Sequence, residues 1–226
     1  MKNYYEYTDY TVIIGDIIDS KEIEDRKNAQ TKFKKILADI NEKYSEDIAS
    51  KFTIVLGDEF QGLLKNRNNI IKIIFEIEMA MAPIALRFGV GIGEVSTDIN
   101  YEYSSEIDGP AYHRARAMME NLQSSKSQYS KRQANILISS QVGNAEIDKL
   151  LNSILSVCTA LKSKWTLRQT EIIGVYLKSE ENQYKAAEKL EIGQSSVNKA
   201  LNSANFYTYK SAMDSVNLFL SEKGED

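Results

Sequence analysis

Two carboxylate sites, each directly after a glycine at the end of an apolar run, are the residues best placed to do chemistry. Asp16 follows Gly15 in the segment IIGDI, and Asp58 and Glu59 follow Gly57 in the segment VLGDEF. If the two runs are neighbouring strands, their carboxylates meet at one edge of a sheet, where oxygen ligands could hold Mg²⁺ or Mn²⁺. Gly-Asp also marks ordinary turns, so each site alone stays open to that simpler interpretation.

The scarcity of soft metal ligands limits the kind of metal site that this chain could build. The sequence contains one histidine, His113, and one cysteine, Cys158. A single residue of each type excludes an internal disulfide and a cluster of His and Cys ligands, so any bound metal must be held by oxygen atoms. Cys158 lies in an apolar helical segment and is expected in the core. His113 is either an acid–base or phosphate contact or an ordinary packed or surface residue.

The carboxylates need strands to position them, and the N-terminal part of the chain alternates between strand and helix patterns. The expected strands cover residues 10–14, 51–56, 59–64, 86–95 and 135–139, and the expected helices cover 23–48, 68–82 and 110–123. The second and third strands form a hairpin whose tip presents Asp58, and Pro83 ends the second helix. In the fourth strand Gly89, Gly91 and Gly93 alternate, which leaves one face free of side chains so that a ligand could approach the backbone.

Strand patterns end near residue 144, and the rest of the chain has helical periodicity. The expected helices cover 145–161, 167–177, 184–190, 195–204 and 207–220. The sequence therefore predicts an α/β domain over residues 1–143, followed by a small all-α module over residues 144–226.

The stretch AAEKLEIGQSSVNKAL in this module resembles a helix-turn-helix. Its two alanines let the helices approach, Gly193 makes the turn, Gln194 or Ser195 caps the next helix, and Val197 and Leu201 pack it. The outward-facing side chains could contact the base edges and phosphates of duplex DNA. They are Gln194, Ser195, Ser196, Asn198, Lys199 and Asn202. Short helical modules also mediate protein contacts, so that alternative stays open.

Composition restricts the class of protein. The 226 residues carry a formal charge of -4, which argues against a general nucleic-acid coat protein, since such a protein needs surplus Lys and Arg. No apolar run approaches the ~20 residues that span a bilayer, and the N-terminal residues lack the pattern of a signal peptide. We therefore expect a cytoplasmic protein with no membrane partner.

Four segments, in the same order along the chain, resemble the signature blocks of the class III nucleotidyl cyclase catalytic domain, whose fold is shared with GGDEF diguanylate cyclases. They are VIIGDI at 12–17, IVLGDEF at 54–60, LRFGVGIGEV at 86–95 and GPAYHRAR at 109–116. More narrowly, the segments IIGDIIDSK, LGDEFQGLL and DGPAYHRAR, with the helical tail, resemble the SatD family. The resemblance implies a nucleotidyl-cyclase-like, ferredoxin-type sheet with flanking helices, and a nucleoside triphosphate or related nucleotide as ligand.

The resemblance also implies roles for individual residues. Asp16 and Asp58 would bind two ions of Mg²⁺ or Mn²⁺, with Glu59 and the Ile17 carbonyl as further ligands. The nucleotide-binding residues would be Ile17, Ile18, Asp19, Ser20, Lys21, Gly57 and Gly91. For Lys21, a solvated position at the start of a helix is an equally good interpretation. Cyclase domains build their sites across a head-to-tail dimer, so a homodimer is expected.

The sequence departs from the cyclase pattern at several positions. His113 and Ala117 stand where the family has an Asn and a transition-state Arg, although Arg116 could serve after a shift of one residue, and Ile54 replaces the Lys that reads adenine. Losing such an Arg costs rate more than ground-state binding. We therefore expect a Mg²⁺-dependent nucleotide-binding regulator coupled to a DNA-binding helix-turn-helix.

Two alternatives remain open. One is an active nucleotidyl cyclase or other phosphoryl-transfer enzyme that uses two metal ions. Its catalytic residues would be Asp16, Asp58, Arg116 and His113. The other is a scaffold that has kept only the fold and binds no nucleotide.

Overall fold

A five-stranded sheet with the strand order β2-β3-β1-β4-β5 forms the centre of the molecule. The computed structural model describes residues 9–124, 134–140 and 145–222. The strands are β1 (Tyr10–Ile17), β2 (Ile48–Leu56), β3 (Glu59–Leu64), β4 (Leu86–Gly93) and β5 (Ile136–Ser139). β1 is antiparallel to both β3 and β4, β2 is antiparallel to β3, and β5 is parallel to β4. With one helix after β1 and one after β3, the first four strands have the βαββαβ order of a ferredoxin-type sheet. The predicted α/β class is confirmed.

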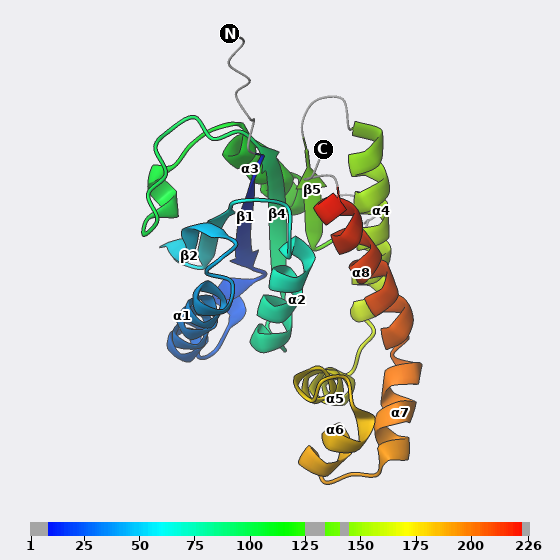
Figure 1. The fold of residues 1–226 in the computed structure, drawn as a ribbon. Helices are drawn as coiled ribbons and strands as arrows, with labels where there is room; N and C mark the ends of the chain where they lie inside the picture. The colour runs from blue at the N-terminus through cyan, green and yellow to red at the C-terminus, as the bar shows by residue number, and fades with distance from the viewer. Residues whose placement is uncertain (1–8, 125–133, 141–144, 223–226) are drawn as a thin grey trace.

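Helices cover both faces of the sheet. α1 (Arg26–Lys43) and α2 (Ile70–Met81) lie on one face and α3 (Pro110–Ser124) on the other, and Figure 1 shows α1 and α2 in front of the sheet with α3 behind it. In α1 the apolar residues recur at three- and four-residue intervals, so they form one buried stripe. They are Phe33, Ile36, Leu37 and Ile40. As predicted, α2 ends just before Pro83, which cannot continue a helix.

Two short turns of 3-10 helix were not predicted. η1 (Ser20–Glu22) follows β1, and η2 (Ser104–Glu106) lies in the long connection between β4 and α3. The helix expected from residue 23 begins at Arg26 instead, because the Asp25 carboxylate accepts a hydrogen bond of 2.9 Å from the Asn28 N–H and so caps the helix there.

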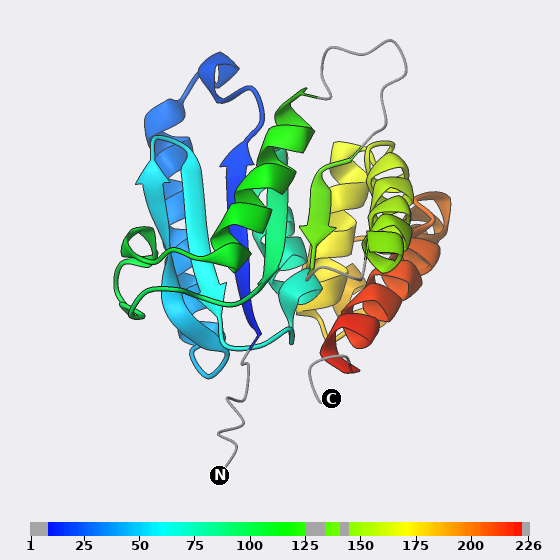
Figure 2. The ribbon, with the colours of Figure 1, turned by 90° about the horizontal axis from the view of Figure 1, so that it is seen from above.

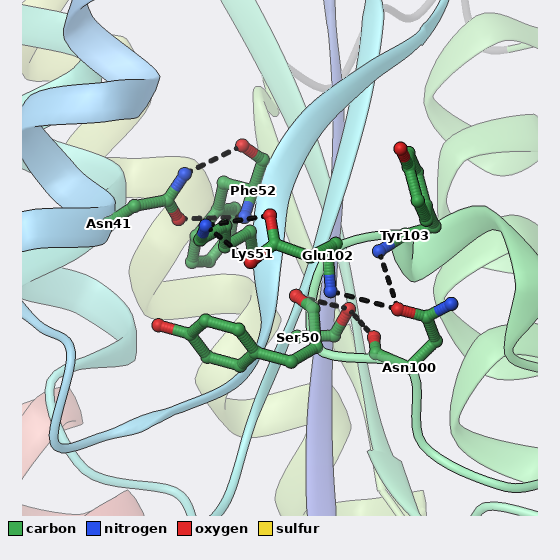
Figure 3. Close-up of polar contacts among 8 residues, drawn as sticks. Asn41, Ser50, Lys51, Phe52, Asn100, Glu102 and Tyr103 are labelled. Carbon is green, nitrogen blue, oxygen red and sulfur yellow. Dashed lines mark hydrogen bonds and ion pairs between the residues drawn. The ribbon is translucent and has the colours of Figure 1, made fainter.

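The free edge of β2 is closed by the connection between β4 and α3, as Figure 3 shows. The Lys51 N–H donates to the Tyr101 carbonyl at 2.8 Å, and the Ser50 hydroxyl donates to the Asn100 carbonyl at 2.6 Å. Close by, the side-chain amide of Asn41 in α1 pairs with both the N–H and the C=O of Phe52, which falls in a break of the β2–β3 register. Covering an edge in this way prevents the addition of a further strand.

The opposite edge, at β5, is closed by α4 (Ala145–Lys162). The Asn152 side chain accepts from the Ile138 N–H at 2.7 Å and donates to the Ile138 carbonyl at 2.8 Å. The Asp148 carboxylate accepts from the backbone and the hydroxyl of Ser140. Both edges of the sheet are therefore sealed by side chains from helices or by a connecting segment.

The C-terminal helices are α4, α5 (Leu167–Lys178), α6 (Gln183–Lys189), α7 (Gln194–Ser203) and α8 (Phe206–Glu222). All five were predicted, with bounds that differ by two residues at most. Residues of α4 and α8 belong to the same buried core as the sheet, whereas α5, α6 and α7 form a second core with Phe206. Figures 1 and 2 show α4 and α8 beside β5. The last described strand thus ends at Ser139, but the core of the sheet continues into α4 and α8, and the division into two domains stays a prediction.

The second core is joined to the first where the chain leaves α4 and where it enters α8. The Trp165 indole N–H donates to the Ala204 carbonyl at 2.8 Å, and its ring packs edge-on against Tyr209 at 4.9 Å between centroids. The buried Glu78 of α2 also forms an ion pair with Lys162 at the end of α4. Within the described residues, no helix has the length and apolar character needed to cross a membrane.

Candidate functional site

Asp16, the first predicted site residue, lies near the end of β1 and is bound by an arginine of the neighbouring strand. Arg87 stands opposite Asp16 in the β1–β4 register, and its Nε and Nη2 atoms donate to Oδ1 and Oδ2 at 2.6 and 2.9 Å. Gln123 at the end of α3 donates to Oδ2 at 3.2 Å. Asp16 is only 7% exposed, so this bidentate pair supplies the counter-charge that a buried carboxylate requires.

Asp58 lies in the β2–β3 hairpin turn that the sequence predicts, and Glu59 begins β3. Partial burial raises the pKa of the Glu59 carboxyl, the positive charge of Arg116 lowers it, and the negative charges of Asp16 and Asp58 raise it further. The charges of Asp16, Asp58 and Arg116 therefore all act on Glu59, which puts these groups in one region of the molecule. The result is a mixed acidic and basic cluster at one end of the sheet.

The carboxylates as folded do not fit a divalent metal ion. Both oxygens of Asp16 already accept hydrogen bonds from Arg87, and a guanidinium in that position repels a second cation. Among the described residues, no three His, Cys, Asp or Glu side chains are grouped so that they could hold a metal. We therefore derive no chemical step through a metal ion, and the predicted Mg²⁺ or Mn²⁺ stays a prediction.

The loop that was expected to hold phosphates lies directly after β1. The Ile18 N–H donates to the Ala85 carbonyl at 2.9 Å, so this backbone group already has a partner. Asp19 has a left-handed backbone (φ 52°) ahead of η1, and the exposed Lys21 lies within that turn. The N-terminus of α1 is occupied by the carboxylate of Asp25. The residues Ile17, Ile18, Asp19, Ser20 and Lys21 stay predicted nucleotide contacts.

The two predicted glycine contacts differ in what the structure says of them. Gly57 has a positive φ of 61° at the hairpin tip, as a tight turn requires, and its carbonyl accepts from Gln30 of α1 at 3.3 Å. Gly91 instead makes room for α3, since a Cβ there would lie 2.0 Å from the Ala111 carbonyl oxygen. The bare strand face expected to admit a ligand therefore admits a helix, which corrects that interpretation of Gly91.

His113 lies away from the acidic cluster. It is exposed on the first turn of α3 and pairs with Asp108 at 3.2 Å, whereas Gln123, ten residues further along the helix, contacts Asp16. Ten residues of α-helix span about 15 Å. The structure therefore does not bring His113 to Asp16, which is against its predicted catalytic role. Of the two arginines nearby, Arg114 donates to the Ile92 carbonyl at 2.6 Å and is used in packing.

Arg87 and Gln123 are site residues that the sequence reasoning missed. The signal for Arg87 was a lone charged residue in the otherwise apolar strand LRFGVGIG, but only the strand register shows that it faces Asp16. A third polar residue, Gln61, is fully buried on β3, and neither atom of its side-chain amide has a partner among the described residues. Because an unpaired buried amide is costly, Gln61 is a further candidate for a ligand contact.

A well-formed pocket lies away from the acidic cluster. Its volume is about 600 Å³, and it lies between α1, α2, α5 and α8 with an apolar floor. Its charged rim is largely self-paired, since Lys43 binds Glu76 at 2.6 Å and Lys210 binds Asp214 at 2.7 Å. We assign the chemistry to the acidic cluster instead, because that is where charged groups are held in a buried arrangement.

The predicted DNA-binding residues lie on α7. Ser195, Ser196, Asn198, Lys199 and Asn202 are exposed and Gln194 is half-buried. The buried Val197 and Leu201 pack the helix as predicted. The expected cap is different: Gly193 is the N-cap residue without a side-chain bond, and Glu191 has the left-handed backbone of the turn. Several of these polar side chains bond one another, for example Asn202 Nδ2 to Asn198 Oδ1 at 2.9 Å.

Comparison with solved structures finds cyclase domains with low overall similarity. A bacterial light-regulated adenylyl cyclase has 13% identity and a TM-score of 0.42, covering 71% of this chain and 82% of that one. The adenylyl cyclase CyaB from P. aeruginosa has 17% identity and a TM-score of 0.38, covering 64% and 81%. The guanylate cyclase domain of RhGC from Catenaria anguillulae, solved with GTP, has 16% identity and a TM-score of 0.33, covering 50% and 73%.

The family comparison covers nearly the whole described chain. No curated protein matches this sequence. The SatD family model, in contrast, matches residues 10–218, which include the sheet, the acidic cluster and the C-terminal helices. The chain therefore belongs to the SatD family.

Proposed function

We propose that this protein binds a nucleoside triphosphate or related nucleotide at the acidic cluster and that the bound state controls a DNA-binding surface on α7. The observation that carries the first part is the buried pair of Asp16 and Arg87 near the end of β1, with Glu59 near enough for the charges of Asp16 and Arg116 to act on it. The two guanidinium groups supply positive charge for phosphate groups, and the carboxylates beside them supply acceptors for sugar hydroxyls. The order of the four cyclase-like sequence blocks supports the same ligand class.

In this proposal each residue has a chemical task. Arg116 is exposed and free to meet a phosphate, whereas Arg87 is held against Asp16 and would exchange that partner for phosphate oxygens. Asp58 lies in the hairpin turn and forms no hydrogen bond or ion pair with another described residue, so its oxygens are available to a ligand.

The predicted Mg²⁺ or Mn²⁺ is not part of this proposal, because Arg87 occupies both oxygens of Asp16, the carboxylate that would have to hold the ion.

A second candidate is the phosphoryl-transfer enzyme. The feature that favours it is the exposed Arg116 in the cyclase-like block GPAYHRAR, because a guanidinium near a reacting phosphate stabilises charge in the transition state. In a phosphoryl-transfer enzyme, Asp16, Asp58 and Arg116 would be the catalytic residues. His113 is too far along α3 to join them.

Nucleotide binding is tested by incubating the purified protein with ATP, GTP, CTP and UTP, each with and without Mg²⁺ or Mn²⁺. Thermal shift reports binding, and product chromatography reports chemistry. We expect a stabilising shift with one nucleotide, reduced by Asp58→Asn and by Arg116→Met but not by the control Asp98→Asn in an exposed loop. A cyclic or pyrophosphate product would establish the enzyme, and the absence of any shift would contradict both candidates.

The DNA-binding part is tested by fluorescence anisotropy with a labelled duplex at several salt concentrations. We expect salt-dependent binding that changes when the nucleotide is added and weakens with Lys199→Ala and Asn198→Ala. Lys35→Ala, an exposed lysine on α1, is the control. Equal binding by all three variants would show that α7 does not contact DNA.

A further inference from the structure

An apolar stripe on α4 lies beside the face that packs against the core. Its members recur at intervals of three and four residues, the spacing of a helix that packs against another helix. They are Ile147, Leu150, Ile154, Val157 and Leu161, of which Ile147, Leu150 and Val157 are exposed, Leu161 is half-buried and Ile154 packs partly against the core. Leu150 and Val157 are 62% and 60% exposed, which is unusual for two large aliphatic side chains one heptad apart on the same helix.

The neighbouring face of α4 is used within the chain. Leu151, Leu155 and Cys158 are buried in the core that includes the sheet, and Asn152 closes the edge of β5. Figure 1 shows α4 beside β5 and α8 at the outer edge of the molecule. The helix is therefore rigidly held, while its apolar stripe remains open to a partner.

A second copy of this chain cannot join by extending the sheet. Loop 94–109 covers the edge of β2, and Asn152 pairs with the backbone of the edge strand β5. With both edges sealed, self-association has to use a helical surface.

The charges at the two ends of α4 favour a second α4 in the antiparallel direction. Glu146 lies in the first turn and Lys164 just beyond the last, and both are exposed. Neither forms an ion pair with another described residue. An antiparallel pair of stripes places the Glu146 of each copy toward the Lys164 of the other, and it also aligns the helix dipoles favourably.

We propose that α4 is a self-association surface and that two copies of the chain pair through their Ile147–Leu161 stripes in an antiparallel, two-fold arrangement. This surface differs from the head-to-tail contact implied by the cyclase resemblance, which would cover the acidic cluster. The proposal stands independently of nucleotide binding, because no residue of the stripe belongs to that cluster.

The first test measures the molar mass of the full chain by light scattering across a range of concentrations. We expect a wild-type dimer and a monomer for Leu150→Glu/Val157→Glu, with the thermal midpoint at high dilution unchanged because both side chains are exposed. Leu167→Glu, which alters a leucine that is 73% exposed on α5, is the matched control and should stay dimeric. A wild-type monomer at all concentrations, or a double variant that stays dimeric, would overturn the proposal.

Single cysteines test the direction of pairing in a Cys158→Ala background. Ser153→Cys lies near the centre of the stripe, so it should form a disulfide with its own mate across the two-fold axis. In an antiparallel pair centred on residue 154, Glu146→Cys lies about 24 Å from its mate along the helix axis, at 1.5 Å per residue, and should not cross-link. Efficient cross-linking through Glu146→Cys would contradict the antiparallel arrangement.

Discussion

Asp16 and Arg87 form the pair on which the acidic cluster depends. Both side chains are largely buried and meet through two hydrogen bonds. Removing one member of such a pair leaves an uncompensated charge inside the protein, whereas removing both exchanges the pair for neutral contacts. The geometry of the cluster is therefore sensitive to each residue alone and less sensitive to the two together.

Arg87→Met should lower the free energy of unfolding by about 3–5 kcal/mol, because Asp16 is left buried without a counter-charge. Adding Asp16→Asn should recover part of this loss. Urea denaturation of the two single variants and the double variant measures the coupling. Additive losses would show that the two side chains do not depend on each other.

Glu59→Gln should make the protein more stable near neutral pH. The pKa of Glu59 is raised above its ordinary value of 4.5, mainly by burial, so the wild type loses stability as pH rises through the folded-state pKa. The amide of the variant mimics the protonated acid and avoids this loss. Thermal midpoints of both proteins from pH 3.5 to 7.5 should converge at the acidic end, and a constant difference would contradict the assignment.

At the scale of the elements, the contact between β4 and α3 is the closest in the site. Gly89 and Gly91 both let the backbone of α3 approach the strand, and the same approach brings Gln123 to Asp16. The alternating glycines therefore determine the distance between α3 and the sheet.

Gly91→Ala should destabilise the fold by about 3 kcal/mol, at the upper end of what overpacking costs, since the added Cβ would meet the Ala111 carbonyl oxygen at 2.0 Å. The matched control is Gly174→Ala in α5, where a Cβ lies 3.7 Å from the nearest atom. That change should stabilise by about 0.5–1 kcal/mol through helix propensity. Relative to the wild type, the denaturant midpoint should fall for Gly91→Ala and rise for Gly174→Ala, and shifts in the same direction would contradict this prediction.

The elements themselves could be predicted from the sequence, because periodicity, Pro83 and the hairpin glycine are local signals. The contacts between elements could not. Arg87 faces Asp16 only because of the β1–β4 register, and the separation of His113 from Asp16 follows from the direction in which α3 crosses the sheet. Such facts depend on the packing of segments far apart in the chain, which a single sequence does not encode in any short pattern.

At the scale of the whole molecule, the sheet and two of the C-terminal helices fold as one unit. Leu155 of α4 and Val216 of α8 lie in the core of the sheet, and the Asn217 side chain accepts from the Ile71 N–H at the start of α2 at 3.2 Å. A side chain of α8 thus caps the start of α2, although the two helices are separated by more than half of the sequence.

A chain cut after residue 143 should fail to form a stable domain, because the apolar surface beneath α4 and α8 would be exposed to water. We expect aggregation or strong binding of a hydrophobic dye, where the full chain shows neither. A soluble fragment with a cooperative melting transition would show instead that the predicted N-terminal domain folds alone.

The hydrogen bond from Trp165 to the Ala204 carbonyl holds together the two ends of the α5–α7 segment. The two ends of residues 166–203 therefore lie close together, so this segment could be replaced without moving the chain on either side of it. Replacing residues 166–203 by a short Gly-Ser linker should leave the sheet and α8 folded. A three-helix segment from another protein should also be accepted there if its two ends lie equally close together. Because Met79 of α2 also packs against this segment, the segment is held to the rest of the molecule at its two ends and along α5.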